Sequence, residues 1–150
     1  MRESQETLEL YAATMNTTPL VRHEVPDQNN PKDLIGEKKV QLGLLPAAGK
    51  IYGALAMEFG AYHAGKEKTG YGPFNWREKK VRMTIYLDAI ERHLEALRDG
   101  EDAAKDSGVH HLGHIIAGAS ILADALEGGQ LIDDRPMKGP AAALLERVKK

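Results

Sequence analysis

The chain has 150 residues, the length of one ordinary domain, and can bury a core without stabilising cross-links. Its 20 Lys and Arg nearly balance 22 Asp and Glu, so no global field favours a nucleic-acid polymer or an anionic membrane as partner. The absence of Cys excludes disulfides, thiolate nucleophiles and Cys-ligated zinc. No apolar run approaches the ~20 residues of a bilayer span, and the N-terminus lacks a signal-peptide pattern, so we expect a cytoplasmic protein.

Residues 1–40 form a polar N-terminal arm, and residues 41–150 form the main domain, with a tail from about residue 130. Within the arm we expect a short helix over residues 6–15, followed by an irregular segment rich in Pro, Asp and Asn. The arm is therefore suited to wrapping a partner subunit.

The first helix of the main domain should begin at Pro46, because proline costs little in the first helical turn. Ile51, Leu55, Phe59 and Tyr62 recur at helical spacing after it. Residues 65–76, GKEKTGYGPFNW, then hold three glycines and a proline and predict a loop. Aromatic residues on such a loop indicate either an anchor into the core or a surface for a flat ligand.

Two further helices are expected, one from about residue 81 to 98 and one from Ser107, as its cap, to Leu126. The short acidic connection between them makes them antiparallel neighbours. The tail turns at two prolines and ends in a short amphipathic helix. Because no stretch alternates over strand lengths, the predicted fold class is all-α.

Three histidines are expected on the facing sides of these two helices. His93 lies beside the apolar stripe of the first helix, and His111 and His114 share one face of the second. Clustered buried imidazoles are costly unless something organises them, and a divalent cation can do so. Two interpretations stay open: metal-ligating or catalytic histidines, and core histidines satisfied by hydrogen bonds.

Carboxylates surround the same region, on the first helix and in the connection that follows it. Hard cations prefer oxygen ligands, so acids mixed with imidazoles favour Mg²⁺ or Mn²⁺ over structural zinc. The other interpretation is a solvated charged face. Phosphate-binding GxxxxGK[ST] and hydrolase GxSxG motifs are absent from the sequence.

Four segments together resemble a known family. They are KTGYGPFNWR (68–77), RHLEALRDGED (92–102), SGVHHLGH (107–114) and DDRP (133–136). Over about residues 38–137 the chain resembles the phage-encoded dATP/dGTP diphosphohydrolases, which are MazG-like enzymes of the all-α nucleoside triphosphate pyrophosphohydrolase superfamily. The resemblance implies a helical bundle, completed by a homodimer or a dimer of dimers, that holds metal between ExxE and ExxD motifs.

This sequence departs from that metal-binding pattern. His111 and His114 stand where Glu and Asp are expected, and the preceding helix offers either Asp88 and Glu91 as a DxxE motif or His93 in a shifted register. The implied metal ligands are therefore drawn from these five residues, with Mg²⁺ or Mn²⁺ as the cofactor.

The resemblance also implies hydrolysis of dGTP, dATP or both to the monophosphate and pyrophosphate, in the host cytoplasm if the protein is phage-encoded. A nearby carboxylate would orient or deprotonate water, with Glu101 and Asp102 as the candidates. Substrate-binding candidates are Lys68 and Arg77 for phosphate, Tyr71 and Trp76 for stacking on the base, and Asn75 for its edge.

Two other classes of function compete with this one. An HD-type phosphohydrolase also gathers His and Asp on helices, but the sequence has no His-Asp dipeptide. A non-enzymatic helical oligomerisation or nucleotide-sensing module predicts that metal leaves the melting temperature unchanged.

Overall fold

The computed structural model describes residues 30–149, and the helix expected over residues 6–15 lies outside them. The chain divides into two compact units, Met1–Leu42 and Gly43–Lys150. In the first unit, α2 (Pro31–Gly36) begins with Pro31 in its first turn, and the Asn30 side chain accepts a hydrogen bond from the Lys32 backbone N–H at 3.0 Å. This helix was not expected in the arm.

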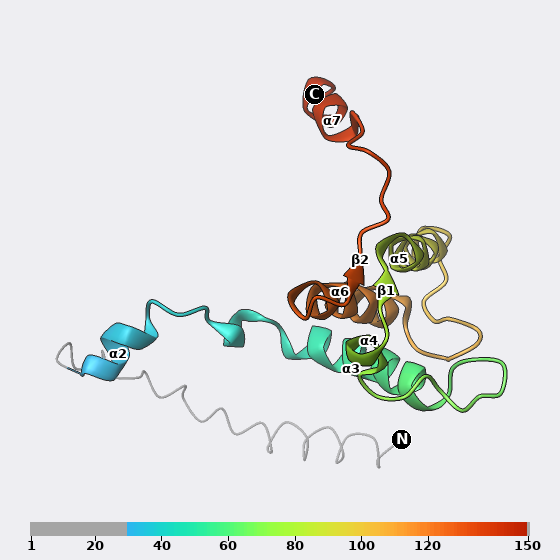
Figure 1. Ribbon diagram of the computed structural model, residues 1–150, viewed down its shortest axis with the longest axis horizontal. Helices are drawn as coiled ribbons and strands as arrows, with labels where there is room; N and C mark the ends of the chain where they lie inside the picture. Colours follow the sequence, from blue (N-terminus) through green and yellow to red (C-terminus); the bar gives the residue numbers. More distant parts are fainter. Residues whose placement is uncertain (1–29, 150) are drawn as a thin grey trace, which may run out of the picture. The chain divides into compact units, whose positions relative to one another are not determined.

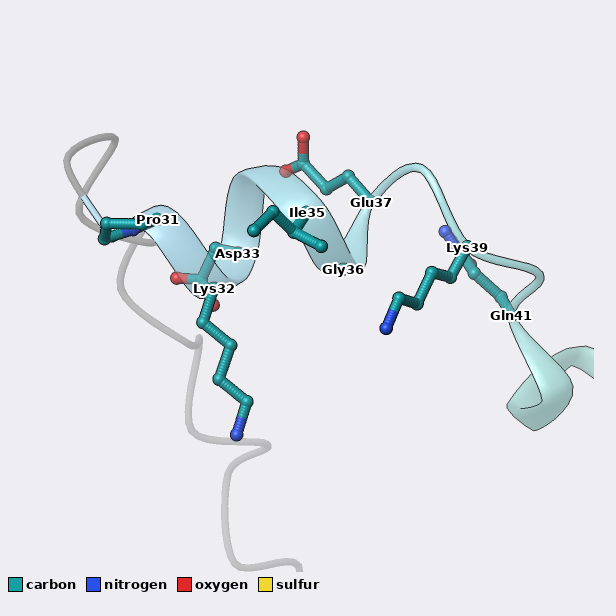
Figure 2. A pocket seen from close by; sticks show the side chains of 8 residues that line it. All are labelled: Pro31, Lys32, Asp33, Ile35, Gly36, Glu37, Lys39 and Gln41. Atoms are coloured by element: carbon teal, nitrogen blue, oxygen red, sulfur yellow. The ribbon is translucent and has the colours of Figure 1, made fainter.

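Figure 2 shows a recess between α2 and the segment that follows it. The recess has a volume of about 790 Å³, and its side chains come only from residues 31–41. None of these residues is buried, so the recess lacks the desolvated walls of a ligand pocket.

The second unit is built on three long helices: α3 (Ala47–Tyr62), α5 (Met83–Arg98) and α6 (His111–Glu127). Shorter elements are η1 (Leu42–Leu44), at the boundary of the two units, α4 (Asn75–Glu78) and α7 (Ala141–Arg147). Figure 1 shows α6 between α3 and α5, and it packs against both. The predicted all-α class is confirmed, and the helix predicted from Pro46 is α3, with Pro46 as its N-cap.

Small residues let α3 and α6 approach closely. A Cβ on Gly53 would lie 2.7 Å from Ile116 Cγ2, and one on Gly113 would lie 2.5 Å from the Tyr52 carbonyl oxygen. Both positions therefore require glycine for backbone packing. The apolar residues that indicated α3 in the sequence are not its packed face, because Ile51 and Leu55 are 61% and 46% exposed.

The predicted antiparallel arrangement of the other two long helices is confirmed by their contacts. His93, late in α5, meets His111 at the start of α6. Ile90, one turn earlier in α5, lies against Gly118, two turns later in α6. The prediction of Ser107 as the cap of α6 is wrong: His110 is the N-cap, and its Nδ1 accepts a hydrogen bond from the Leu112 backbone N–H at 3.1 Å.

Two short strands were not predicted. β1 (Val81–Arg82) pairs in parallel with β2 (Leu131–Ile132), so the segment before α5 lies beside the segment after α6 (Figure 1). Each strand has two residues, too few to show alternation in a sequence. The pairing holds the ends of the α5–α6 hairpin together.

Asp134, in the DDRP segment, reinforces this closure. Its carboxylate accepts hydrogen bonds from the Thr84 backbone N–H at 2.9 Å, the Thr84 hydroxyl at 2.7 Å and Arg82 Nε at 2.8 Å. α5 has no side-chain cap from its own N-cap residue, so the tail supplies it. Within residues 30–149, no helix is long and apolar enough to cross a membrane.

Candidate active site

The structure brings the three predicted histidines together where α5 crosses the start of α6. The Nδ1 atoms of His93 and His111 are 2.8 Å apart, so one ring donates a hydrogen bond to the other. The rings of His93 and His114 are stacked, with centroids 4.5 Å apart and an interplanar angle of 8°. We call these three residues the histidine cluster.

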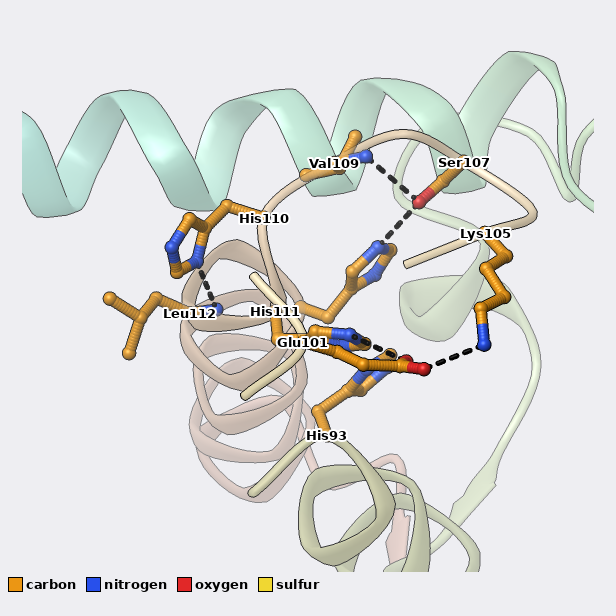
Figure 3. Close-up of polar contacts among 9 residues, drawn as sticks. His93, Glu101, Lys105, Ser107, Val109, His110, His111 and Leu112 are labelled. Carbon is orange, nitrogen blue, oxygen red and sulfur yellow. Dashed lines mark hydrogen bonds and ion pairs between the residues drawn. The ribbon is translucent and has the colours of Figure 1, made fainter. Parts of the chain in front are cut away.

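Ser107 holds the third ring of the cluster from the α5–α6 connection (Figure 3). Its Oγ is 2.8 Å from His114 Nε2 and accepts a hydrogen bond from the Val109 backbone N–H at 3.1 Å. The serine that was predicted to cap the helix therefore orients an imidazole instead.

Burial favours the neutral forms of His93 and His114 near pH 7. Desolvation is the main cause that lowers the pKa of both His93 and His114, and the neighbouring imidazoles lower it further. The Asp106 carboxylate opposes this shift at both rings. Neutral imidazoles have lone pairs available for a proton or a metal.

His111 has an unpartnered nitrogen in a buried position. The residue is 4% exposed, and among the described residues Nε2 has no hydrogen-bond partner. The nearest carboxylate oxygen in an ion pair with it is Glu101 Oε2, at 3.9 Å (Figure 3). Lys105 donates to the other Glu101 oxygen at 2.6 Å and is the main cause that lowers the pKa of this carboxyl. A carboxylate whose ionised form is favoured thus lies 3.9 Å from the nitrogen that makes no hydrogen bond.

The two carboxylates predicted as metal ligands, Asp88 and Glu91, do not lie beside the histidine cluster. Asp88 and Glu91 are exposed and line a groove with Asp133 and Arg135. Glu91 precedes His93 by two residues, about 200° of helical rotation, so the two project from nearly opposite sides of α5. Across the described residues, no three His, Asp or Glu side chains are arranged to hold a metal ion.

Asp102, predicted as a catalytic carboxylate, contributes through its main chain. Its carbonyl oxygen accepts a hydrogen bond from the His111 backbone N–H at 2.9 Å, and the residue is exposed. This bond fixes the start of α6, and hence the position of His111.

An apolar cavity of about 200 Å³ adjoins the histidine cluster. It lies among α3, α4, α5 and α6, and we call it the slot. Its walls include Gly60, Tyr71, Asn75, Trp76, Tyr86, His93 and His114. The slot thus contains three of the five predicted substrate-binding residues and two of the three clustered histidines.

A second, more polar cavity of about 320 Å³ opens near the same cluster, and we call it the recess of Lys68. His63, Lys68, Tyr71 and Asp106 line it, and Tyr71 is shared with the slot. Lys68 has φ 55°, a left-handed conformation that is uncommon for a residue other than glycine. A strained backbone next to a polar cavity is frequent at ligand sites.

Arg77 and Trp76 are both tied to α6 through Asp124. Trp76 Nε1 donates to Asp124 at 2.6 Å, and Arg77 donates two hydrogen bonds to the same carboxylate at 2.7 and 2.9 Å. Arg77 and Trp76 together hold the pKa of Asp124 at about 2. Arg77 is therefore engaged in an ion pair, and Trp76 combines the two expected roles: it anchors the turn and lines the slot.

Several features of this site were not predicted from the sequence: the part played by Gly60, His63 and Tyr86, and the orienting role of Ser107. Ser107 lies shortly before the paired histidines at positions 110 and 111, and that proximity was the available signal. Nothing in the sequence distinguishes Gly60 from the other glycines of α3.

Residues 29–135 match the family described as "dATP/dGTP diphosphohydrolase, N-terminal". The chain belongs to this family. The matched region contains the histidine cluster, the slot, the recess of Lys68 and the Asp134 cap, and α7 lies beyond it. The family resemblance inferred from the sequence is thereby confirmed.

A dATP/dGTP diphosphohydrolase of Salmonella phage PMBT28 is similar to part of the chain. The two are 32% identical over 71 residues, which cover 47% of this chain and 23% of that protein. No solved structure matches the chain.

Proposed function

We propose that this protein hydrolyses dGTP and dATP to the nucleoside monophosphate and pyrophosphate, with Mg²⁺ or Mn²⁺ as cofactor. Family membership supports the substrate class. The observation that carries the chemistry is the buried, unpartnered Nε2 of His111 opposite the Glu101 carboxylate. Buried polar atoms are nearly always paired, so an unpaired one beside a carboxylate is a candidate ligand atom.

His111 and Glu101 fit one side of a divalent-metal site. Mg²⁺ usually binds through one or two protein carboxylates and takes its remaining ligands from water and substrate phosphates, so a complete protein cage is not required. A ligating histidine normally donates its other ring N–H to an acceptor, and His93 Nδ1 is in place to accept from His111 Nδ1. When bound, such an ion would neutralise phosphate charge and polarise the phosphorus–oxygen bonds.

The remaining groups position the triphosphate and the attacking water. Lys68 supplies a cation for the phosphates in its recess, and Asp106 supplies a carboxylate there that accepts a proton from water. The water oxygen bonds to the α-phosphorus, the bond from that phosphorus to the bridging oxygen breaks, and pyrophosphate leaves. Ser107 keeps His114 oriented beside this space.

Product analysis tests the proposal directly. The purified chain is incubated with each of the four deoxynucleoside triphosphates and Mg²⁺ or Mn²⁺, and products are resolved by anion-exchange chromatography and ³¹P NMR. We expect monophosphate and pyrophosphate from dGTP and dATP. A nucleoside with inorganic triphosphate would instead establish the HD-type reaction, and intact triphosphates throughout would contradict any hydrolase.

A homodimer is also part of this proposal. Ile51, Leu55 and Tyr62 expose an apolar stripe along α3, at 61%, 46% and 55% exposure. Contiguous exposed apolar surface on a helix is typical of a subunit interface. The stripe lies on a different face from Gly53, which packs on α6, so association through it leaves the histidine cluster intact.

A further inference from the structure

We propose that the slot receives the purine base, and that Gly60 is the residue that keeps the slot open for it. The identity of the ligand rests on the proposed function. The argument for a ligand in the slot rests on its size, on Gly60 and on two polar groups without partners.

The size of the slot suits one flat ring system. Its volume of about 200 Å³ is below the roughly 300–1,000 Å³ of pockets that bury a whole drug-sized ligand. Aromatic rings of Tyr71, Trp76 and Tyr86 line it, together with small residues such as Ala117 and Gly118. Aromatic walls provide stacking surfaces for a base, and the small residues leave the space between them free.

Neither of the usual reasons for a glycine, a positive φ or close packing against a neighbouring element, applies to Gly60. It lies in the interior of α3, where glycine is unfavourable compared with alanine, and its φ is not positive. A Cβ at this position would meet no atom within 4 Å, in contrast to Gly53, where it would lie 2.7 Å from Ile116. Gly60 lines the slot and the space around such a Cβ is open, so a methyl group there is expected to take volume from the slot.

The Asn75 amide and the Tyr86 hydroxyl line the slot in partly exposed residues and make no hydrogen bond to any described residue, so both are available to a ligand. An amide offers one donor and one acceptor side by side, which matches the adjacent donor and acceptor on the edges of both adenine and guanine. Burial raises the pKa of Tyr86, so its hydroxyl stays protonated and able to donate. These groups provide polar recognition in an otherwise apolar cavity.

Intrinsic tryptophan fluorescence reports on the slot, because Trp76 is the single tryptophan of the chain and lines it. Deoxyguanosine and deoxyadenosine, which lack phosphate, are titrated against the full chain while Trp fluorescence is recorded. Deoxycytidine and thymidine serve as controls. We expect a saturable change with the purine nucleosides at concentrations at least tenfold below those needed for the pyrimidines.

Gly60→Ala and Gly49→Ala form a matched pair of variants. Both replace a glycine of α3, and a Cβ at Gly49 would make only an ordinary contact, 3.9 Å from Ile116 Cδ1, outside the slot. Both should raise the melting temperature by about 2–4 °C, since alanine favours helix. Only Gly60→Ala should weaken purine nucleoside binding, by about tenfold or more, while Gly49→Ala binds as the parent does.

The outcomes separate this inference from the proposed function. Hydrolysis of dGTP or dATP without a purine-dependent fluorescence change, or with unchanged nucleoside affinity in Gly60→Ala, would overturn the base slot and leave the hydrolase. Purine binding that Gly60→Ala weakens, with no hydrolysis of any triphosphate, would support the slot and overturn the hydrolase. Equal weakening in Gly49→Ala would show that the effect is not local to the slot.

Discussion

Residue-scale chemistry centres on His111, a 4% exposed histidine with one nitrogen bonded to His93 and the other free. Leaving a buried polar atom unpaired costs about 1–3 kcal/mol, a large fraction of the stability of a domain this size. Such a cost is tolerated where the atom serves in function, for example by binding a ligand. Glu101 is the charged group nearest to this nitrogen, so a ligand of His111 would also lie beside the Glu101 carboxylate.

Glu101→Gln should lower kcat/KM for dGTP by about 100-fold, because it removes the charge opposite His111 Nε2 while keeping the shape. Glu95→Gln is the matched control, since Glu95 is an exposed carboxylate paired with Arg98 on α5. Steady-state kinetics at several metal concentrations measures both variants. A loss that more metal does not relieve, and that Glu95→Gln shares, would contradict a role for Glu101 at the site.

The histidine cluster predicts acid sensitivity in metal-free protein. Folding lowers the pKa of His93 and His114 below their ordinary value of 6.5, so the unfolded chain binds more protons near and below that pH. The contribution of these two histidines to stability is therefore complete above about pH 7 and decreases as the pH falls through 6.5 toward the folded values. Melting curves from pH 8 to 5 in EDTA should show this decrease, and it should be smaller in His93→Gln. A flat profile in the parent would contradict neutral, partly buried rings at His93 and His114.

The sequence predicted the three histidines on facing helices, because the period of a helix places them beside apolar positions. It named Glu101 as a candidate carboxylate but also Asp88 and Glu91, which motif spacing favours as metal ligands. The rotation of α5 about its axis decides between them, and it is set by which face packs on α6. That packing turns His93 inward and leaves Glu91 exposed.

At the scale of elements, the three glycines of α3 have three different environments. Gly53 permits backbone contact with α6, Gly60 lines the slot, and Gly49 does neither. The sequence shows the same residue at each position, and only the neighbouring helices distinguish them. The existence and length of α3 were predictable from apolar spacing, whereas its packed face was not, because glycine and alanine form it.

Asp134→Asn should lower the melting temperature by several degrees more than Asp133→Asn. Asp134 caps α5 through Thr84 and pairs with Arg82, whereas Asp133 pairs only with Arg135, two residues away. Adjacent acids thus give a matched comparison of a long-range cap with a local pair. Calorimetry at pH 7 measures it, and equal shifts would contradict the capping role.

The same cap should weaken in acid. Hydrogen bonds from Thr84 and Arg82 hold the pKa of Asp134 at about 2, below its ordinary value of 3.8. Its contribution is therefore present above about pH 4 and is lost as the pH falls toward 2. The difference in melting temperature between the parent and Asp134→Asn should narrow over that interval.

For the whole molecule, the proposed function predicts two measurable properties: stabilisation by a divalent metal and formation of a homodimer. A cation that binds only the folded state, at a hundred times its dissociation constant, adds about 2.7 kcal/mol of stability. Thermal melts with Mn²⁺ or Mg²⁺ should therefore shift upward in the parent and much less in Glu101→Gln. An unshifted melting temperature would favour the interpretation of the histidines as core hydrogen-bonding residues.

Leu55→Glu should convert a dimer into a monomer, because it places a charge in the middle of the exposed stripe of α3. Sedimentation velocity at micromolar concentration measures the change. The side chain is 46% exposed, so the helix itself tolerates the substitution. Arg98→Gln, at an exposed position of α5 outside the stripe, makes the net charge more negative by the same amount and is the control. A parent that sediments as a monomer would contradict the proposed homodimer.

The pairing of β1 with β2 and the Asp134 cap join the start of α5 to the segment after α6, and so close the open end of the α5–α6 hairpin. The residues from about 136 onward follow this closure in the chain and take no part in it. A protease that cuts among the exposed residues 136–140 should trim α7 and leave an intact, enzymatically competent fragment. For the same reason, a fusion partner or affinity tag attached beyond this point should be tolerated, whereas a truncation before Leu131 should unravel the hairpin.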